Sequence, residues 1–207
     1  MSQFFQIHPE NPQQRLIAQA VAIIRSGGVV IYPTDSCYAL GCHLGDKGAV
    51  DRIRRIRGVN SQHDFTLVCR DLAEVGVYAR LDNVAFRMIK NITPGPYTFI
   101  LPATGEVPRR LLNPKRKTIG VRIPDNAIVR SLLDSLGEPI MSTTLSLPGE
   151  EFPMSDPYDM RDTLGNQVDL IIDGGNCGLE ATTVVSLLDG VPEVLRQGKG
   201  DVSGIIT

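Results

Sequence analysis

Side chains that carry hydroxyl groups are concentrated at three points of the sequence. The first follows the apolar run at residues 29–32, within the stretch VVIYPTDSCYALGC. The second lies in MSTTLSL and the third in EATTVV. Hydroxyls donate and accept hydrogen bonds, so such groups suit a polar ligand, although strand propensity and turn capping explain any one of them. In the first stretch Thr34 and Asp35 are expected to shape the turn. The candidate ligand-binding hydroxyls are those of Ser36, Tyr38, Ser142, Thr143, Thr144, Ser146, Thr182 and Thr183.

Arginines occupy positions that suit an anionic ligand. Arg122 lies in the alternating segment TIGVRIP, directly before a proline, and Arg196 lies in EVLRQG. The guanidinium fork matches phosphate and carboxylate groups. A charge within an apolar strand needs a partner, which is either a ligand or an internal acid.

A third group of arginines lies in DRIRRIRG, where Arg55 and Arg57 precede Gly58. On a continuous helix the two side chains would point about 200° apart. Gly58 is expected to end the helix, which would let Arg57 turn toward the same ligand as Arg55. The alternative is a solvated helix face.

The segment RRLLNPKRKT forms a basic patch without acidic residues. It is either a surface loop or a contact for a nucleic-acid backbone. Binding through such a contact would weaken at high salt and would depend little on the nucleotide sequence. We predict RNA binding for its cations, which are Arg109, Arg110, Lys115, Arg116 and Lys117.

Several kinds of site are not expected. The phosphate-binding, dinucleotide-binding, serine-hydrolase and zinc-protease motifs are all missing from the sequence, and the histidines are scattered. Catalysis by a histidine is therefore not expected. Cys37 and Cys42 lie beside His43 but lack further ligands nearby, so no metal site is predicted. The net charge is −2, no apolar run is long enough to span a membrane, and the first residues lack the pattern of a secretory signal, so we expect a cytoplasmic protein.

The elements that would position these residues alternate between helices and strands. Helices are expected at 11–28, capped by Asn11 with Pro12 as first residue, and at 47–57, 83–92 and 126–137. Strands are expected at 29–32, 65–69, 97–102, 118–123, the start of 139–147, 167–175, 182–188 and 192–198. Because several strands follow one another late in the chain, we predict one α/β domain over 1–207 with a mixed parallel and antiparallel sheet.

Seven segments taken in order resemble the YrdC-like family, whose best-known members are threonylcarbamoyl-AMP synthases. They are YPTDSCYALG, RRIRG, PGPYTFIL, TIGVRIP, MSTTLSLPG, IIDGG followed by ATTVV, and VLRQG. The similarity extends from about residue 13 to residue 196, and within the family it is greatest to the YciO branch. It implies a twisted open α/β sandwich around a concave, positively charged cleft.

The resemblance also implies a reaction, in which ATP, bicarbonate and L-threonine give threonylcarbamoyl-AMP and pyrophosphate, with Mg²⁺ accompanying ATP. The product serves a tRNA modification, and family members also bind tRNA or double-stranded RNA. By position, the residues implied for threonine are Ser36, Tyr38, Cys69, Arg122, Ser142 and Thr182. Those implied for ATP are Arg57, Thr118, Thr144 and Arg196.

The implied catalytic set departs from the family pattern. The synthases carry Lys-x-Arg and later Ser-x-Asn, where this chain has Arg55, Arg57, Thr144 and Ser146. The segment GVNSQHDF after Arg57 also differs from the usual proline-bearing turn. Losing one oriented donor costs ~10²–10³ in rate. Three hypotheses follow: a synthase-like enzyme, of full or weak activity; an RNA-binding or ribosome-associated factor with little catalysis; and a nucleotide sensor.

Overall fold

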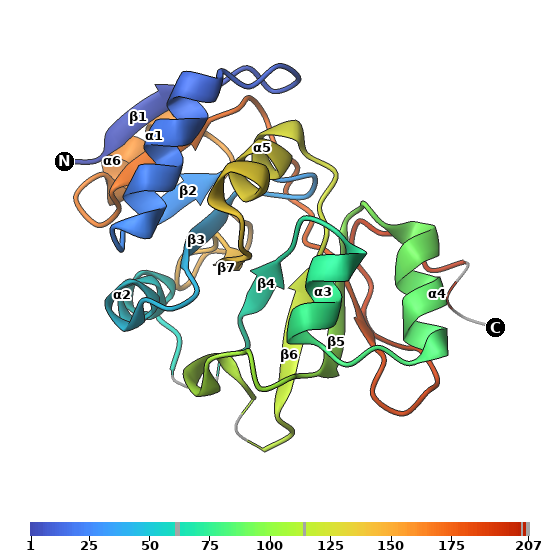
Figure 1. Ribbon diagram of the computed structural model, residues 1–207. Helices are drawn as coiled ribbons and strands as arrows, with labels where there is room; N and C mark the ends of the chain where they lie inside the picture. The colour runs from blue at the N-terminus through green and yellow to red at the C-terminus, as the bar shows by residue number, and fades with distance from the viewer. Residues whose placement is uncertain (61–62, 114, 204, 206–207) are drawn as a thin grey trace.

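One mixed ten-stranded sheet runs through the computed structural model, which describes residues 1–60, 63–113, 115–203 and 205. The strand order is β1-β8-β2-β3-β7-β4-β6-β5-β9-β10. The pairs β1–β8, β2–β8, β4–β6 and β5–β9 are parallel, and the other neighbours are antiparallel. Figure 1 shows β1 and α4 on opposite sides of the molecule. The predicted α/β class and the mixed sheet are confirmed.

The strands and helices have the following bounds. The strands are β1 (Gln3–Gln6), β2 (Val30–Tyr32), β3 (Ala39–His43), β4 (Thr66–Val68), β5 (Tyr97–Pro102), β6 (Thr118–Arg122), β7 (Ile140–Thr144), β8 (Leu170–Asp173), β9 (Thr183–Ser186) and β10 (Glu193–Arg196). The helices are α1 (Gln14–Arg25), α2 (Lys47–Arg57), α3 (Leu72–Tyr78), α4 (Asn83–Ile92), α5 (Ala127–Leu136) and α6 (Pro157–Leu164), with a 3₁₀ turn at Arg109–Leu111.

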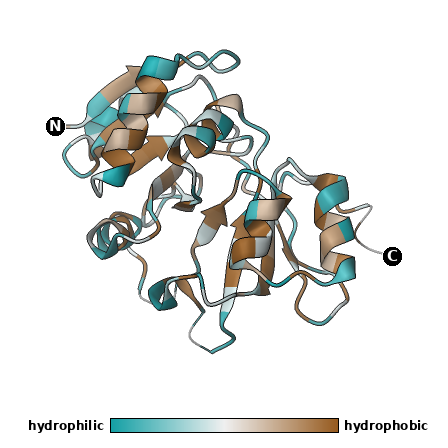
Figure 2. Cartoon of the chain, in the orientation of Figure 1, coloured by the Kyte–Doolittle hydropathy of each residue, from teal (hydrophilic) through white to brown (hydrophobic). Residues whose placement is uncertain are grey.

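The half of the sheet near the N-terminus is covered by α1 and α5, which pack side by side (Figure 1). Successive residues of a strand point to opposite faces. Val30 and Tyr32 therefore join the hydrophobic cluster formed with these two helices, while Ile31 joins a second cluster on the other face. The hydropathy colouring of Figure 2 shows α1 with a hydrophobic and a hydrophilic side, as expected for a helix that covers a sheet.

The other half of the sheet uses the same alternation to leave one face open. In β4, β6 and β5 the buried side chains Leu67, Val121 and Phe99 share a hydrophobic cluster with Val75 of α3 and Ile89 of α4. On each of these strands, the residues directly before and after the buried one point to the opposite face. That face carries hydroxyl groups, a glycine and an arginine, and it forms the floor of a large cavity.

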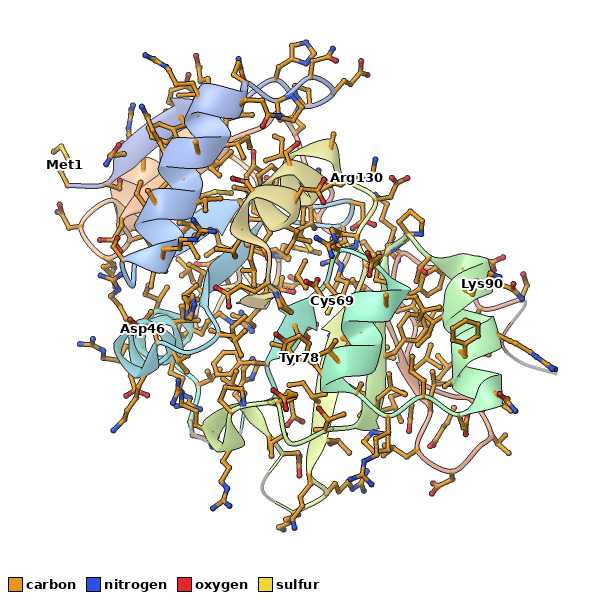
Figure 3. The ribbon with its side chains drawn as sticks, viewed as in Figure 1. Met1, Asp46, Cys69, Tyr78, Lys90 and Arg130 are labelled. Atoms are coloured by element: carbon orange, nitrogen blue, oxygen red, sulfur yellow. The ribbon has the colours of Figure 1, made fainter. Side chains whose placement is uncertain are left out.

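The helix α2 begins and ends as the sequence predicts. The Asp46 carboxylate accepts a hydrogen bond from the Ala49 amide at 2.8 Å, and Figure 3 shows Asp46 at the start of this helix. Gly58 ends the helix with φ 62°, a left-handed conformation that favours glycine.

The predicted start of α1 is wrong. Gln13 is the N-cap, and Asn11 and Pro12 lie outside the helix. The reason is a local turn centred on His8, whose Nδ1 accepts hydrogen bonds from the Glu10 and Asn11 amides. The Asn11 amide is thus occupied before the helix begins.

Four elements were not predicted: β1, β3, α3 and α6. Two have clear start signals, because the carboxylates of Asp71 and Asp156 cap α3 and α6. The strand β3 consists mainly of small residues, and its pairing with β2 and β7 decides its conformation. Within the described residues, no helix has the length and apolar character needed to cross a membrane.

Candidate functional site

A cavity of about 820 Å³ lies against the open face of the sheet. Its floor comes from alternate residues of β4, β6 and β5, because these point away from the hydrophobic cluster under α3 and α4. The floor residues are Thr66, Val68, Thr98, Ile100, Thr118, Gly120 and Arg122. Side chains of β7 and β10, the end of α2 and the loops at 151–153 and 179–182 form the walls.

Gly120 gives this floor its depth. A Cβ atom at this position would lie 3.0 Å from Thr66 Oγ1 and 3.5 Å from Thr98 Cγ2. Larger side chains would extend from that point into the cavity. The glycine therefore leaves room for a ligand between the two threonine side chains.

Arg122 is the most deeply buried charged group of the cavity, with 8% of its surface exposed. Its Nη2 donates to Thr34 Oγ1 at 3.1 Å and to Ser36 Oγ at 2.9 Å, and it forms an ion pair with Asp35. The sequence left open whether Arg122 meets a ligand or an internal acid, and the structure shows the internal acid. All three contacts fall on Nη2, and Nε is buried without a partner among the described residues.

Arg57 reaches the cavity from the end of α2. Its Nη1 donates to the main-chain oxygen of Ser146, at 2.5 Å, and this contact joins α2 to the segment after β7. Its Nε is also buried without a partner within the described part of the chain. Burial lowers the pKa of Arg57 from its usual value. Donors without partners are costly in a folded protein, so water or a ligand is expected to satisfy them.

Arg196 and Thr182 form the wall nearest the C-terminus. The Arg196 Nη2 donates to the main-chain oxygen of Thr182 at 2.9 Å, and the Thr182 hydroxyl lies 2.8 Å from that of Thr98. This arrangement connects the last strand to the floor. It also leaves the remaining guanidinium donors of Arg196 free to meet an anion.

The β7 strand contributes hydroxyls on both of its sides. Ser142 Oγ lies 2.6 Å from the Tyr32 hydroxyl, and burial raises the pKa of Tyr32 to about 12, so this phenol stays protonated. Thr143 Oγ1 lies 3.2 Å from His63 Nε2. Both Thr144 and Ser146 also line the cavity.

Most of the residues that the sequence singled out for chemistry lie together in this cavity. They are Arg57, Thr118, Arg122, Ser142, Thr144, Ser146, Thr182 and Arg196. Ser36 does not line the cavity, but its hydroxyl accepts a hydrogen bond from Arg122, which does. Tyr38 is fully buried, and its hydroxyl donates to the main-chain oxygen of Gly175 at 2.7 Å.

Two further expected residues lie outside this cavity. Arg55 is exposed on α2 and does not line the cavity. Cys69 lines a separate cavity of about 400 Å³, together with Lys90 and Arg130. Figure 3 shows Cys69 at the end of β4, close to α3 and α5. Burial raises the pKa of the Cys69 thiol well above its ordinary value.

The basic patch divides into two parts. Arg110 is held in place, because its guanidinium donates to the main-chain oxygens of Leu44 and Gly45. Arg116 lies at the edge of the cavity and is exposed, as are Lys115 and Lys117. The Arg109 side chain is exposed on the 3₁₀ turn. Pro114, which precedes Lys115, lies outside the described residues.

Sequence reasoning missed several residues of the site. Asp35 was treated only as a turn residue, although it is the ion-pair partner of Arg122. Thr66 and Thr98 could have been found from strand alternation, since each lies one position from a buried apolar residue. The segment GVNSQHDF was noted only for its unusual content. Ser61 and Gln62 of that segment lie outside the described residues, but His63 and Asp64 line the cavity.

The cavity also contains carboxylates, those of Asp64, Glu151 and Glu180. The predicted positive charge of the cleft therefore stays a prediction. In the part of the chain that the structure describes, no group of three or more metal-ligating side chains converges.

Comparison with known proteins decides the family. The model of the Sua5/YciO/YrdC domain, described as "Telomere recombination", matches residues 22–198. The chain belongs to the Sua5/YciO/YrdC family. The resemblance inferred from the motifs is thus confirmed, and so is the similarity to YciO. The uncharacterized YciO protein of Escherichia coli K12 is 62% identical over 202 residues, which are 98% of each chain.

Solved structures of the Sua5/YciO/YrdC family have the same fold. The crystal structure of E. coli YciO matches all of this chain with a TM-score of 0.96. The P. abyssi Sua5 structure complexed with L-threonine is 28% identical, with a TM-score of 0.86 over 94% of this chain and 57% of that one. A more distant relative is the threonylcarbamoyl-AMP synthase of Nitrosococcus oceani, 33% identical over 75% of this chain and 83% of its own length.

Proposed function

We propose that the cavity binds L-threonine and ATP and that the protein forms threonylcarbamoyl-AMP and pyrophosphate from them with bicarbonate. The observation that carries the proposal is the grouping of Arg57, Arg122 and Arg196 with strand-end hydroxyls around one cavity. Its volume, about 820 Å³, is within the range of small-molecule sites. The family relationship to a Sua5 complexed with L-threonine supports it.

The threonine side of the cavity is assigned to Arg122, Ser142 and Thr182. A carboxylate would be held by the guanidinium donors of Arg122 that Asp35 leaves free, as a charge-assisted pair. The hydroxyls of Ser142 and Thr182 are buried and oriented by Tyr32 and Thr98, which suits them to hold the polar groups of a small amino acid.

The nucleotide side is assigned to Arg57, Thr118, Thr144 and Arg196. Both arginines are fixed by main-chain oxygens and keep further donors, an arrangement suited to phosphate oxygens. The apolar side chains of Phe152 and Leu195, which are exposed at the cavity rim, offer a surface on which a purine ring can stack.

We assign Mg²⁺ to the nucleotide rather than to the protein. Because no cluster of ligating side chains is found among the described residues, the ion would be held mainly by phosphate oxygens and water, its usual coordination in such sites. Bound in this way, it would supply positive charge to offset the charge of the phosphate groups.

Weak turnover is expected from the changed catalytic set. Arg55 is exposed on α2 and does not line the cavity, and Ser146 lacks the second donor and the reach of an asparagine. Arg57 matches the arginine of the family's Lys-x-Arg pattern and lines the cavity. We therefore expect ATP binding to be retained better than the rate of the reaction.

The test is a pyrophosphate-release assay with ATP, Mg²⁺ and bicarbonate, with and without L-threonine. The proposal predicts threonine-dependent release, and Ser146→Asn is expected to increase it by restoring an amide donor. An Arg122→Met variant serves as the negative control. No threonine-dependent release by the unaltered protein would refute the proposal.

RNA binding is a second candidate function, favoured by the exposed cations Lys115, Arg116 and Lys117 beside the cavity edge. Filter binding of a tRNA at two salt concentrations tests it. Replacement of all three cations by glutamine should reduce both the affinity and its salt dependence. Affinity that does not change with salt would contradict this function.

A further inference from the structure

His63 is held against the cavity wall by contacts on two sides. Its Nε2 lies 3.2 Å from Thr143 Oγ1, and its ring meets the Phe65 ring edge-on, with centroids 5.3 Å apart and planes at 80°. Both His63 and Thr143 line the cavity. No pattern in the sequence predicts a histidine at this place, because the other histidines, His8 and His43, lie far away in the chain.

Three charged groups face His63. Arg54 and Arg57 approach it from α2, and Asp64 is its neighbour in the chain. Thr143, which contacts it from β7, is uncharged. Burial lowers the pKa of His63 from the ordinary value of 6.5, Arg57 and Arg54 lower it further, and Asp64 acts in the opposite direction. The imidazole is therefore neutral at neutral pH. With its proton on Nδ1, its Nε2 accepts the hydrogen bond that the Thr143 hydroxyl donates.

The reaction proposed above, on which this inference rests, releases one proton that needs an acceptor. The threonine ammonium group loses two N–H bonds as its nitrogen forms a bond to the bicarbonate carbon. The C–OH bond of bicarbonate breaks, and that hydroxide leaves as water with one of the two protons. The products are the carbamate, water and one further proton, so the charges balance only when a base takes that proton.

We propose that His63 accepts this proton through the hydroxyl of Thr143. The hydroxyl oxygen of Thr143 takes a proton from the amino group of the substrate. The proton that this hydroxyl already carried passes to His63 Nε2, and the imidazole becomes an imidazolium. Arginine side chains cannot serve, because they stay protonated. Asp64 is already an acceptor for the Asn113 side-chain amide, at 3.2 Å. A neutral imidazole fits the task because its unprotonated nitrogen is a proton acceptor, and histidine is the side chain that most often serves as a general base.

The experiment measures the rate of threonine-dependent pyrophosphate release from pH 5 to pH 9. It compares the unaltered protein with His63→Gln, Thr143→Val and the double variant. His43→Gln is the matched control, since His43 pairs with Glu138 at 2.8 Å, away from the cavity. We expect the unaltered protein and the control to lose activity in acid with an apparent pKa below 6.5.

Each variant at the relay should lose about 10²–10⁴ in rate, and the double variant should lose no more than either alone, because the two residues act as one relay. His63→Gln should also lose the acid limb of the pH profile while its threonine affinity, measured by calorimetry, stays unchanged. Thr143→Val, which keeps the size of the side chain, decides the matter if circular dichroism shows that His63→Gln does not fold.

The outcomes separate the two proposals. If the unaltered protein turns over and the variants keep both the rate and the acid limb, the role of His63 is refuted and the proposed function stands. If the unaltered protein shows no threonine-dependent release at any pH, both are refuted.

Discussion

Removal of Asp35 from its buried ion pair with Arg122 should strongly destabilise the protein, because it leaves a buried charge without a partner. The two side chains are 9% and 10% exposed, with Arg122 also bound to Thr34 and Ser36. Asp35→Ala leaves the guanidinium charge buried without its counter-ion. Breaking a buried pair in this way costs about 3–5 kcal/mol. For a chain of this length each kcal/mol lowers Tm by about 2–4 °C, so we expect a fall of roughly 6–20 °C.

Urea denaturation followed by circular dichroism measures this effect. The control is Asp125→Ala, which removes the same charge from an exposed pair with Arg130 at 3.4 Å and should cost less than about 1 kcal/mol. The double variant Asp35→Ala, Arg122→Met should recover part of the loss, because no buried charge then lacks a partner. Equal losses for Asp35→Ala and Asp125→Ala would refute the reasoning.

Three further predictions concern α2 and α3. Arg57→Gln should weaken ATP binding about 10-fold or more in calorimetry, as expected when a charged hydrogen-bond donor is lost. Arg55→Gln should leave ATP binding unchanged, because Arg55 does not line the cavity. Equal effects of the two variants would contradict the assignment of Arg57. Gly58→Ala should lower the free energy of unfolding more than Gly137→Ala: both have positive φ, but a Cβ at Gly58 would lie 2.5 Å from Pro148 Cγ, while Gly137 faces open space. Burial raises the pKa of Glu74, so its contribution to stability is present below pH 4.5 and is lost as the pH rises through the raised pKa. In urea titrations Glu74→Gln should therefore gain stability relative to the unaltered protein between pH 4 and pH 8. A difference in stability that stays constant with pH would refute this.

Strong local signals allowed the sequence to predict the central elements of the fold. The segments containing Thr118–Arg122 and Tyr97–Pro102 alternate clearly between faces, and Gly58 and Gly137 end their helices as expected. The strand Ala39–His43 was missed because its conformation comes from neighbours far away in the chain. Tertiary pairing of this kind leaves little trace in local composition.

The candidate site was also predictable only in part. Arg122 stood out because a charge within an apolar strand needs a partner, and Thr182 stood out as part of a group of hydroxyls. The sequence could not show that Asp35 is the partner of Arg122, since that requires the segment after β2 to approach the end of β6. Nor could it place His63 beside Thr143, because that contact joins the segment after α2 to β7.

The most direct test of the central claim is calorimetric titration of L-threonine into the protein at pH 7.5, with the Arg122→Met variant beside it. We expect saturable binding of one threonine per chain, lost in the variant because Arg122 holds the carboxylate. The double variant Asp35→Ala, Arg122→Met controls for the buried charge left on Asp35. No binding of threonine to the unaltered protein, or equal binding to the unaltered protein and both variants, would contradict the assignment of the cavity.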